Sequence, residues 1–317
     1  MRLVVLFFFL TTLVPITICA SSKFVLSAEA KQNIRKITRR QNTIVQNLCG
    51  RIPDPSTKYR LLIDDGKSAR PGQFPWSVGF VVGIFNHEKC SGTLISDRHI
   101  ITAAHCFYSY SDINLPCKGP KEKSVKDLSV NIAGVCLRDG TKCSDADGIR
   151  RKIKHFAALD SFNSDKCVKG NDLAIAELDR PVQLTKHVLP ACLPTQDQKI
   201  VKNPDYKFYS TGFGRKTSES FASSLYYFAS KIVKYFTPDI ISAKSTDQKA
   251  RICGGDSGGG MLARKNHGPF YVLGIHSFAK ECAPDDDDIE YMSTLVQNHT
   301  VQICKLTGIC PSYAPDQ

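Results

Sequence analysis

From residue 63 onward, the chain alternates short apolar or β-branched runs with clusters of turn residues. The turn residues are clearest at Ser96-Asp97-Arg98 and at Asn266-His267-Gly268. We expect strands at Trp76–Val82, Gly92–Ile95, Ile100–Thr102, Val130–Val135, Leu173–Leu178, Lys207–Thr211, Leu225–Val233, Tyr271–Phe278 and Tyr291–Leu295, and a last helix over Val296–Leu306. Many short strands separated by turns favour an all-β barrel or sandwich over an α/β fold.

The first twenty residues carry a different pattern. Arg2 precedes an apolar run that begins at Leu3 and ends in small residues at Ala20. This is the layout of a secretory signal peptide, here residues 1–20 with cleavage after Ala20. An uncleaved membrane anchor is the alternative, but threonines and Pro15 dilute the run. We therefore expect a secreted, extracellular protein, and no later segment is apolar enough to span a membrane.

Residues 21–62 read as a pro-segment or N-terminal extension ahead of a main domain at 63–317. Apolar residues recur there at helical spacing among basic ones, which predicts a basic amphipathic helix. The apolar positions are Ile34, Ile37, Ile44, Val45 and Leu48. Docking of this helix on the main domain is a simpler interpretation than binding to a membrane.

The net charge of +12 raises the question of nucleic-acid binding. Residues 21–62 hold nine Lys or Arg against two Asp or Glu, and once Arg2 is also set aside the rest of the chain carries only +4. A nucleic-acid groove needs cations spread through the fold and interleaved with aromatic side chains. The charge distribution therefore argues against a nucleic-acid partner.

Thirteen cysteines are present, and removal of a signal that contains Cys19 leaves twelve. An even number in an exported chain predicts a disulfide framework. The sequence has no Cys-x-x-Cys pair and no His-Glu-x-x-His run, so it supports no metal site and no cofactor.

The strongest chemical signal is Cys253-Gly-Gly-Asp-Ser257-Gly-Gly-Gly260. A serine hydroxyl needs a base to take its proton, and an acyl-transfer intermediate needs donors aimed at its oxyanion. A glycine-rich turn exposes the hydroxyl, and it lets the backbone N–H groups of Gly255 and Ser257 point at one spot.

The order of the candidate residues selects among enzyme classes. The serine string also satisfies the Gly-x-Ser-x-Gly elbow of α/β-hydrolases, in which the acid and the histidine follow the serine. Here Thr102-Ala-Ala-His105-Cys106 and Asn171-Asp172-Leu come before Ser257. This is the His, Asp, Ser order of chymotrypsin-like enzymes.

Several strings together resemble the secreted trypsin-like serine proteases, over about residues 63–305. Besides those around the histidine, the acid and the serine, they are Ala69-Arg-Pro-Gly-Gln-Phe-Pro-Trp76, Cys90-Ser-Gly-Thr-Leu-Ile95, Gly212-Phe-Gly214 and Gly274–Phe278. The resemblance implies an all-β fold of two six-stranded antiparallel β-barrels with a C-terminal helix.

The resemblance also implies a role for each residue of the site. Ser257 would be the nucleophile, and His105 the general base and then the acid for the leaving amine. Asp172 would be a buried carboxylate that fixes the tautomer of His105 and stabilises its protonated form. The N–H groups of Gly255 and Ser257 would form the oxyanion hole.

Three disulfides follow from the resemblance: Cys90–Cys106, Cys253–Cys282 and Cys49–Cys192. The other six cysteines allow fifteen pairings, among which the sequence does not select. They are Cys117, Cys136, Cys143, Cys167, Cys304 and Cys310.

The substrate pocket departs from the family pattern. Its floor aligns with Arg251, where trypsin-like members have an aspartate, and its walls align with Ala279 and Ile289 instead of glycines. Ser277 and Phe278 precede Ala279 in an edge to which the substrate backbone would add as a strand. A cationic floor repels lysine and arginine, so we expect non-tryptic specificity.

Three alternatives stay open for this pocket. The slot accepts an acidic or small side chain, or Ile289 fills it while Arg251 turns outward, or Arg251 is solvated and has no substrate role. Asp285–Asp288 on the neighbouring loop reads as solvated, in preference to a calcium site or a partner of Arg251.

Activation is a second departure. In family members, cleavage of the zymogen frees an α-amino group that pairs with an acid next to the serine. Asp256 stands at the position of that acid. Ile63 aligns with the usual new terminus, but cleavage after Arg60 would leave two extra residues and cleavage after Arg51 would leave eleven. The counter-charge of Asp256 is therefore open. Asn298-His-Thr300 is a glycosylation sequon.

The leading hypothesis is a serine endopeptidase that cleaves proteins or peptides through an acyl-enzyme and meets protein inhibitors. A protease-like binding protein, whose pocket never becomes competent, is the alternative from another class. An α/β-hydrolase esterase is the third, and it would use His267, His276 or His299. The esterase hypothesis predicts that neither Cys90–Cys106 nor Cys253–Cys282 forms.

Overall fold

The computed structural model describes residues 22–52, 67–82, 90–109, 120–126, 128–136, 148–164, 170–215, 224–247, 250–279 and 289–311. The strands of the first sheet are β1 (Phe24–Leu26), β3 (Ser77–Val82), β4 (Ser91–Leu94), β5 (His99–Thr102), β8 (Leu128–Ile132), β9 (Ile149–Leu159) and β10 (Ala174–Leu178). Those of the second are β2 (Lys67–Ser68), β11 (Tyr206–Gly212), β12 (Tyr226–Thr237), β13 (Ile240–Ser245), β14 (Gly260–Lys265), β15 (Phe270–Ala279) and β16 (Tyr291–Leu295). A small hairpin pairs β6 (Tyr108–Ser109) with β7 (Lys121–Glu122). The helices are α1 (Arg39–Leu48), η1 (Ala104–Phe107), α2 (Asp160–Ser164), η2 (Val296–His299) and α3 (Thr300–Thr307).

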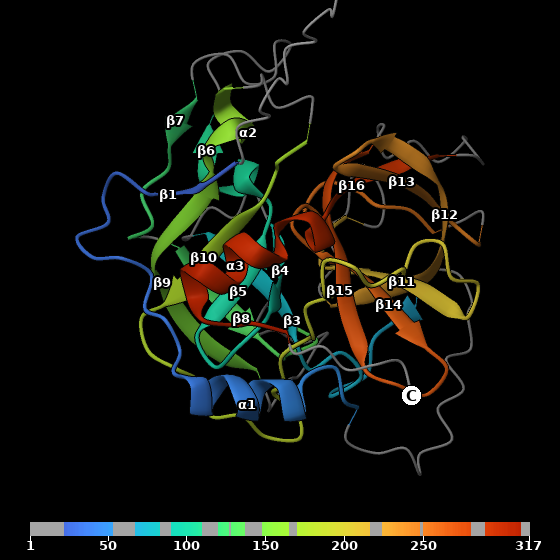
Figure 1. The fold of residues 1–317 in the computed structure, drawn as a ribbon, viewed down its shortest axis with the longest axis horizontal. Helices are drawn as coiled ribbons and strands as arrows, with labels where there is room; N and C mark the ends of the chain where they lie inside the picture. Colours follow the sequence, from blue (N-terminus) through green and yellow to red (C-terminus); the bar gives the residue numbers. More distant parts are fainter. Residues whose placement is uncertain are drawn as a thin grey trace, which may run out of the picture.

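Each large sheet closes on itself. In the first, six strands run in the order β9-β10-β5-β4-β3-β8, and β8 pairs back to β9, with β1 added outside β9. In the second, the order is β11-β14-β15-β16-β13-β12, and β11 pairs with β12, with β2 added outside β12. Closure leaves no exposed sheet edge in the barrel itself. The expected fold of two six-stranded antiparallel barrels with a C-terminal helix is confirmed (Figure 1).

Aromatic side chains join the two barrels. Trp76, fully buried where the chain enters the first barrel, lies 5.3 Å from the ring of Phe270 on β15. Phe74 lies 5.1 Å from the ring of Tyr227 on β12. Large rings that interlock in this way bury much apolar surface. The barrels therefore share one buried cluster, and the site at their junction has a rigid base.

The expected strands all lie on observed ones, and Tyr291–Leu295 has the same bounds. The hydrophobic pattern did not reveal seven strands, which are β1, β2, β6, β7, β9, β13 and β14. The last helix is present, but its first turn is the 3-10 helix η2.

The basic helix expected from Ile34 onward begins later, at Arg39, so this part of the prediction is wrong. Ile34 and Ile37 are buried but lie in an extended segment. The N–H of Ile37 donates to the carbonyl of Thr307 at 2.8 Å, so it is not available to a helix. Thr38 then starts α1 with a capping box, because its hydroxyl accepts from the N–H of Gln41.

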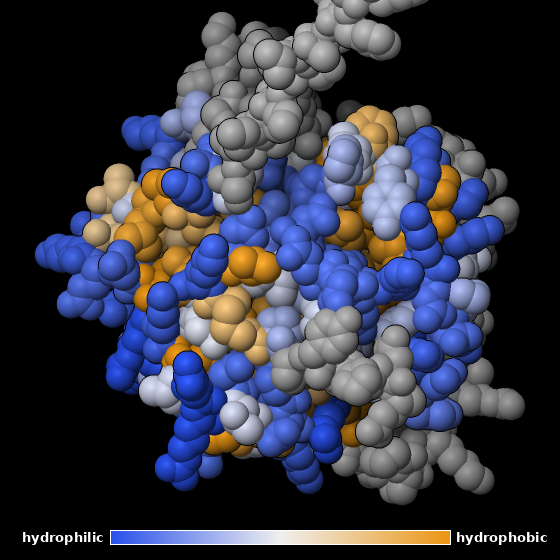
Figure 2. Space-filling model, in the orientation of Figure 1, coloured by the Kyte–Doolittle hydropathy of each residue, from blue (hydrophilic) through white to orange (hydrophobic). Residues whose placement is uncertain are grey.

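The described part of the N-terminal extension, residues 22–52, is fastened to the rest of the chain. Residues Phe24–Leu26 add to β9 as an antiparallel strand, and a disulfide joins Cys49 to Cys192. Its outer face is hydrophilic, as Figure 2 shows over α1. No helix in the described ranges is long and apolar enough to cross a membrane.

Candidate active site

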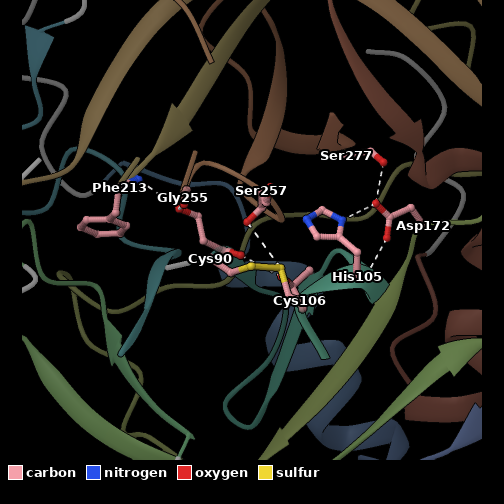
Figure 3. The surroundings of a disulfide bond; sticks show 10 residues. Cys90, His105, Cys106, Asp172, Phe213, Gly255, Ser257 and Ser277 are labelled. Carbon is pink, nitrogen blue, oxygen red and sulfur yellow. Dashed lines mark hydrogen bonds and ion pairs between the residues drawn. A yellow bond between two sulfur atoms is a disulfide. The ribbon is translucent and has the colours of Figure 1, made fainter. Parts of the chain in front are cut away.

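His105 and Asp172 meet at the junction of the barrels. His105 lies on η1, directly after β5, and Asp172 lies just before β10, which pairs with β5. His105 Nδ1 lies 2.7 Å from Asp172 Oδ2, and the backbone N–H of His105 donates to Asp172 Oδ1 at 2.9 Å. Two contacts to one carboxylate fix both the position and the orientation of the imidazole (Figure 3).

The carboxylate of Asp172 is kept ionised. Burial alone would raise its pKa, because Asp172 is only 2% exposed. His105 and a hydrogen bond from the hydroxyl of Ser277 at 2.5 Å outweigh burial, and they hold the pKa of Asp172 below its ordinary value. Asp172 is thus an acceptor that keeps the proton of the imidazole on Nδ1.

Ser257 is brought beside His105 by the glycine-rich turn before β14. Its carbonyl oxygen accepts from the N–H of Ser91 at 2.7 Å and lies 3.8 Å from Sγ of Cys106. In Figure 3 the imidazole of His105 lies between Ser257 and Asp172. No hydrogen bond among the described residues joins the imidazole to the Ser257 hydroxyl. In an unliganded site such a contact is often longer than in the reacting complex.

Gly258 shows why this turn needs glycine. Its φ is +82°, and a Cβ placed on it would lie 2.1 Å from Thr102 Oγ1 and 2.3 Å from the carbonyl oxygen of Ser91. A side chain would therefore push the turn away from β4 and β5, the strands that precede His105.

Two backbone donors beside the Ser257 hydroxyl have no partner within the described part of the chain. They are the N–H groups of Gly255 and Ser257, while the carbonyl of Gly255 accepts from Ser91 Oγ at 2.9 Å. Buried N–H groups are nearly always hydrogen-bonded, so an exception at a candidate site calls for a functional reason. An oxyanion would supply the missing acceptor.

The surroundings of His105 are rigid. The disulfide Cys90–Cys106 ties the residue after His105 to the start of β4. Phe107 stacks on Phe156 of β9 with ring centroids 4.0 Å apart. The two sulfurs and a ring nitrogen of His105 lie within 4.8 Å of one another, but sulfurs bonded to each other are not the thiolates that metals bind.

The disulfide and the barrel fold also settle the esterase alternative. An α/β-hydrolase has neither antiparallel barrels nor this bridge, so that hypothesis is wrong. The ring of His276 bonds Ser293 Oγ at 3.1 Å, and burial lowers its pKa to about 3. The ring of His299 bonds Asp239 at 2.7 Å.

The proposed pocket residues lie at one end of β15 and β16. Ala279 pairs with Tyr291, and Ile289 lies two residues before Tyr291. Phe278 is 45% exposed, as expected for a residue on an open edge. Ile252, the neighbour of Arg251, belongs to the same buried cluster as Tyr291. Arg251 itself is half-buried and has an interaction partner.

Asp256 is a buried carboxylate with backbone donors alone. The N–H groups of Gly214 and Cys253 donate to it at 2.7 Å and 2.9 Å. No cation among the described residues pairs with it. Burial therefore outweighs the hydrogen bonds and raises the pKa of Asp256 to about 7.

Several expected residues lie outside the described ranges. Cys253 and Cys136 are disulfide-bonded, but Cys282, Cys117, Cys143 and Cys167 fall outside, as do Asp285–Asp288, Arg60 and Ile63. The pairing Cys253–Cys282 therefore stays a prediction. Cys304 and Cys310 bond each other. Asn298 is described and exposed, on η2.

Two residues of the site were not singled out from the sequence. Ser91 accepts from the N–H of Phe213 at 3.0 Å while its own hydroxyl bonds Gly255, and so it links the two barrels under the serine turn. Asp239 bonds the residue before Asp172. Ser91 lies inside a quoted string, next to Cys90, whereas no pattern in the sequence marks Asp239.

Comparison with known proteins adds an independent finding. A family model described as Trypsin matches residues 63–289. Transmembrane protease serine 9 of Rattus norvegicus is 29% identical over 237 residues, which are 69% of this chain and 20% of that protein. Phenoloxidase-activating factor 1 of Holotrichia diomphalia is 26% identical over 296 residues, 86% of this chain and 75% of that protein. Coagulation factor IX of Cavia porcellus is 27% identical over 244 residues, 72% of this chain and 76% of that protein.

Proposed function

This chain belongs to the trypsin family of serine proteases, and we propose that it is a secreted endopeptidase in which His105, Asp172 and Ser257 form the catalytic triad. The observation that carries the proposal is the buried, ionised Asp172 bonded to His105 at 2.7 Å, beside a serine turn whose Gly255 and Ser257 N–H groups have no partner among the described residues. Jointly these supply a base, a nucleophile and an oxyanion site.

In the proposed reaction, Nε2 of His105 takes the proton from Ser257 as Oγ attacks the carbonyl carbon of the substrate. Asp172 accepts the Nδ1 proton and stabilises the imidazolium. The N–H groups of Gly255 and Ser257 bind the oxyanion. His105 then protonates the leaving amine. In the second half of the reaction, His105 takes a proton from water as the water attacks the acyl-enzyme, and Ser257 is released.

The non-tryptic specificity is part of the proposal. It rests on the alignment of Arg251 with the floor position and of Ala279 and Ile289 with the wall positions of the family pocket. Substrates would pair their backbone with the edge at Ser277 to Ala279. A glycan at Asn298, a signal at residues 1–20 and a zymogen with an extension at 21–62 complete the proposal.

A fluorophosphonate probe tests the central step, because it reacts with a serine hydroxyl only when a base has activated it. We expect labelling of Ser257 in the secreted, proteolytically processed protein, together with cleavage of a peptide library. Cleavage mainly after lysine or arginine would contradict the specificity assigned from Arg251. Absence of labelling after every processing step would contradict the enzyme itself.

A catalytically silent binding protein is the second candidate. One observation favours it: the only donors to Asp256 among the described residues are backbone N–H groups, and no cation there pairs with it. The probe separates this candidate from the enzyme, since a silent protein would keep its fold and remain unlabelled.

The charge state of Asp256 leads to a prediction for the uncleaved chain. With a folded pKa of about 7 and an ordinary value of 3.8, the folded state holds a proton that the unfolded state loses. The stability linked to this proton is fully present below about pH 4, and it is lost as the pH rises to about 7. The loss amounts to about 4 kcal/mol.

Asp256→Asn should remove this dependence, because the amide does not ionise. Urea unfolding between pH 4 and pH 7.5 measures it, with the exposed Asp205→Asn as a matched control. We expect the stability of the Asp256 variant to vary less with pH than that of the control. Equal pH dependence in the two variants would show that Asp256 already has a counter-charge.

A further inference from the structure

The turn that delivers Asp172 has a backbone conformation that other residues must maintain. Gly170 has a φ of +109° and Asn171 a φ of +63°. For asparagine this left-handed conformation is accessible but not preferred. The N–H of Leu173 donates to the carbonyl of Asn171 at 2.8 Å, so the chain reverses tightly around Asp172 itself. A change in the turn would therefore rotate the carboxylate of Asp172 away from His105.

The side chain of Asp239, from the second barrel, holds the backbone of this turn. Asp239 lies in the link between β12 (Tyr226–Thr237) and β13 (Ile240–Ser245). Its Oδ2 accepts from the N–H of Asn171 at 2.6 Å. A Cβ on Gly170 would lie 2.7 Å from the same oxygen, which shows how closely the carboxylate fits against the turn. Hydrogen bonds to an ionised acceptor are stronger than neutral ones.

Asp239 is itself fixed by its surroundings. Its Oδ1 accepts from His299 Nε2 at 2.7 Å and from Asn298 Nδ2 at 3.2 Å. Its backbone carbonyl accepts from the N–H of Leu295 at 2.8 Å. The side chains of Asp239 and His299 are 15% and 6% exposed, so water competes little for these contacts. The carboxylate therefore has one orientation, with one oxygen directed at the turn.

We propose that Asp239 is a positioning residue, which holds the Gly170–Asn171 turn from the second barrel and so keeps Asp172 directed at His105. The expected effect of Asp239 on catalysis rests on the proposed function of the chain as a serine endopeptidase. The effect on the geometry of Asp172 and His105 is separate from that function and can be measured without a substrate. Asp239 touches no reacting atom, and it acts through Asn171 alone.

Two variants and a matched control test the kinetic effect. Asp239→Ala removes the acceptor of Asn171, and small displacements of a catalytic group lower the rate by about 100-fold. We expect a fall of that order in kcat with little change in KM, because the pocket residues stay in place. Asp239→Asn keeps one oxygen for Asn171 and should lose about tenfold or less. Asp205→Ala, at an exposed position, should leave kcat unchanged.

A pH profile separates positioning from general loosening of the fold. If Asp172 no longer faces His105, the imidazolium is stabilised less, and the acidic limb of kcat/KM moves to lower pH. A merely structural role would lower Tm and leave this limb where it is in the wild type. If Asp239→Ala does not fold, the position of the acidic limb of kcat/KM is measured in Asp239→Asn instead, and a shift to lower pH supports the positioning role.

Proton NMR of protein labelled at the histidine nitrogens gives a readout that needs no activity. The Nδ1 proton of His105, in a 2.7 Å contact with Asp172, should resonate at low field in the wild type and in Asp205→Ala. It should weaken or vanish in Asp239→Ala. This result in a protein without protease activity would uphold the positioning role and refute the proposed function. A folded Asp239→Ala protein with wild-type kcat and an unchanged resonance would overturn the positioning role.

Discussion

Ser257→Ala is expected to lower kcat for peptide hydrolysis by about 10⁶-fold, since loss of the nucleophile removes the acyl-enzyme route altogether. What remains is the catalysis that the oxyanion donors and substrate binding supply alone. The turn should keep its form, because the contacts of Ser257 to Ser91 and Cys106 use its carbonyl oxygen and not its hydroxyl. Steady-state kinetics with the best library substrate gives the magnitude.

Ser109→Ala is the matched control for this change. Ser109 is exposed, and its hydroxyl donates to the carbonyl of Lys121 at 3.2 Å. The control should keep full activity and full fluorophosphonate labelling, whereas Ser257→Ala should lose both without a change in Tm. Residual labelling of Ser257→Ala would mean that another serine reacts and that the site is misassigned.

Asp172→Asn should lower kcat by about 10⁴-fold. The asparagine fits the same space, but its amide has a single acceptor oxygen. That oxygen cannot replace both carboxylate oxygens, which now accept from the backbone N–H and Nδ1 of His105 and from Ser277. His105 then adopts the tautomer with its proton on Nε2, which cannot take a proton from Ser257. Kinetics across pH 5 to 10 should show the loss throughout, because no pH restores the missing acceptor.

The same variant has an effect on acid stability. The folded pKa of Asp172 lies below its ordinary value, so ionisation stabilises the folded state above the unfolded pKa, and this stability is lost as the pH falls through the folded pKa. Asp172→Asn lacks this contribution, and its unfolding free energy should vary less below about pH 4. An Asp172→Asn protein with near wild-type kcat would contradict the assignment of the triad.

The fold class could be predicted because it depends on local strings, and the same strings marked the candidate residues of the site. The turn approaches Thr102 so closely at residue 258 that only glycine fits. This glycine directly follows Ser257, so the local sequence shows it. The chain order of His105, Asp172 and Ser257 then identified the topology that brings them together. β9 was missed because its first half holds the consecutive basic residues Arg150, Arg151 and Lys152 and its second half is continuously buried, so no single strand pattern fits the whole.

Contacts between distant segments could not be predicted. Ile34 and Ile37 have the spacing of a helix, but backbone N–H groups of that segment donate to Glu177 in the first barrel and to Thr307 in α3 instead of to a helix. Asp239 lies 68 positions from Asn171, and only the closing of both barrels brings them together.

The disulfide between Cys49 and Cys192 has a consequence for the maturation of the protein. Residue 49 lies before, and residue 192 after, any backbone cut made between residues 52 and 67. Such a cut would add one water and yield two polypeptides that stay linked by this disulfide, so a denaturing gel would separate them only under reducing conditions. Activation would then create a new N-terminus without releasing the N-terminal piece from the protein.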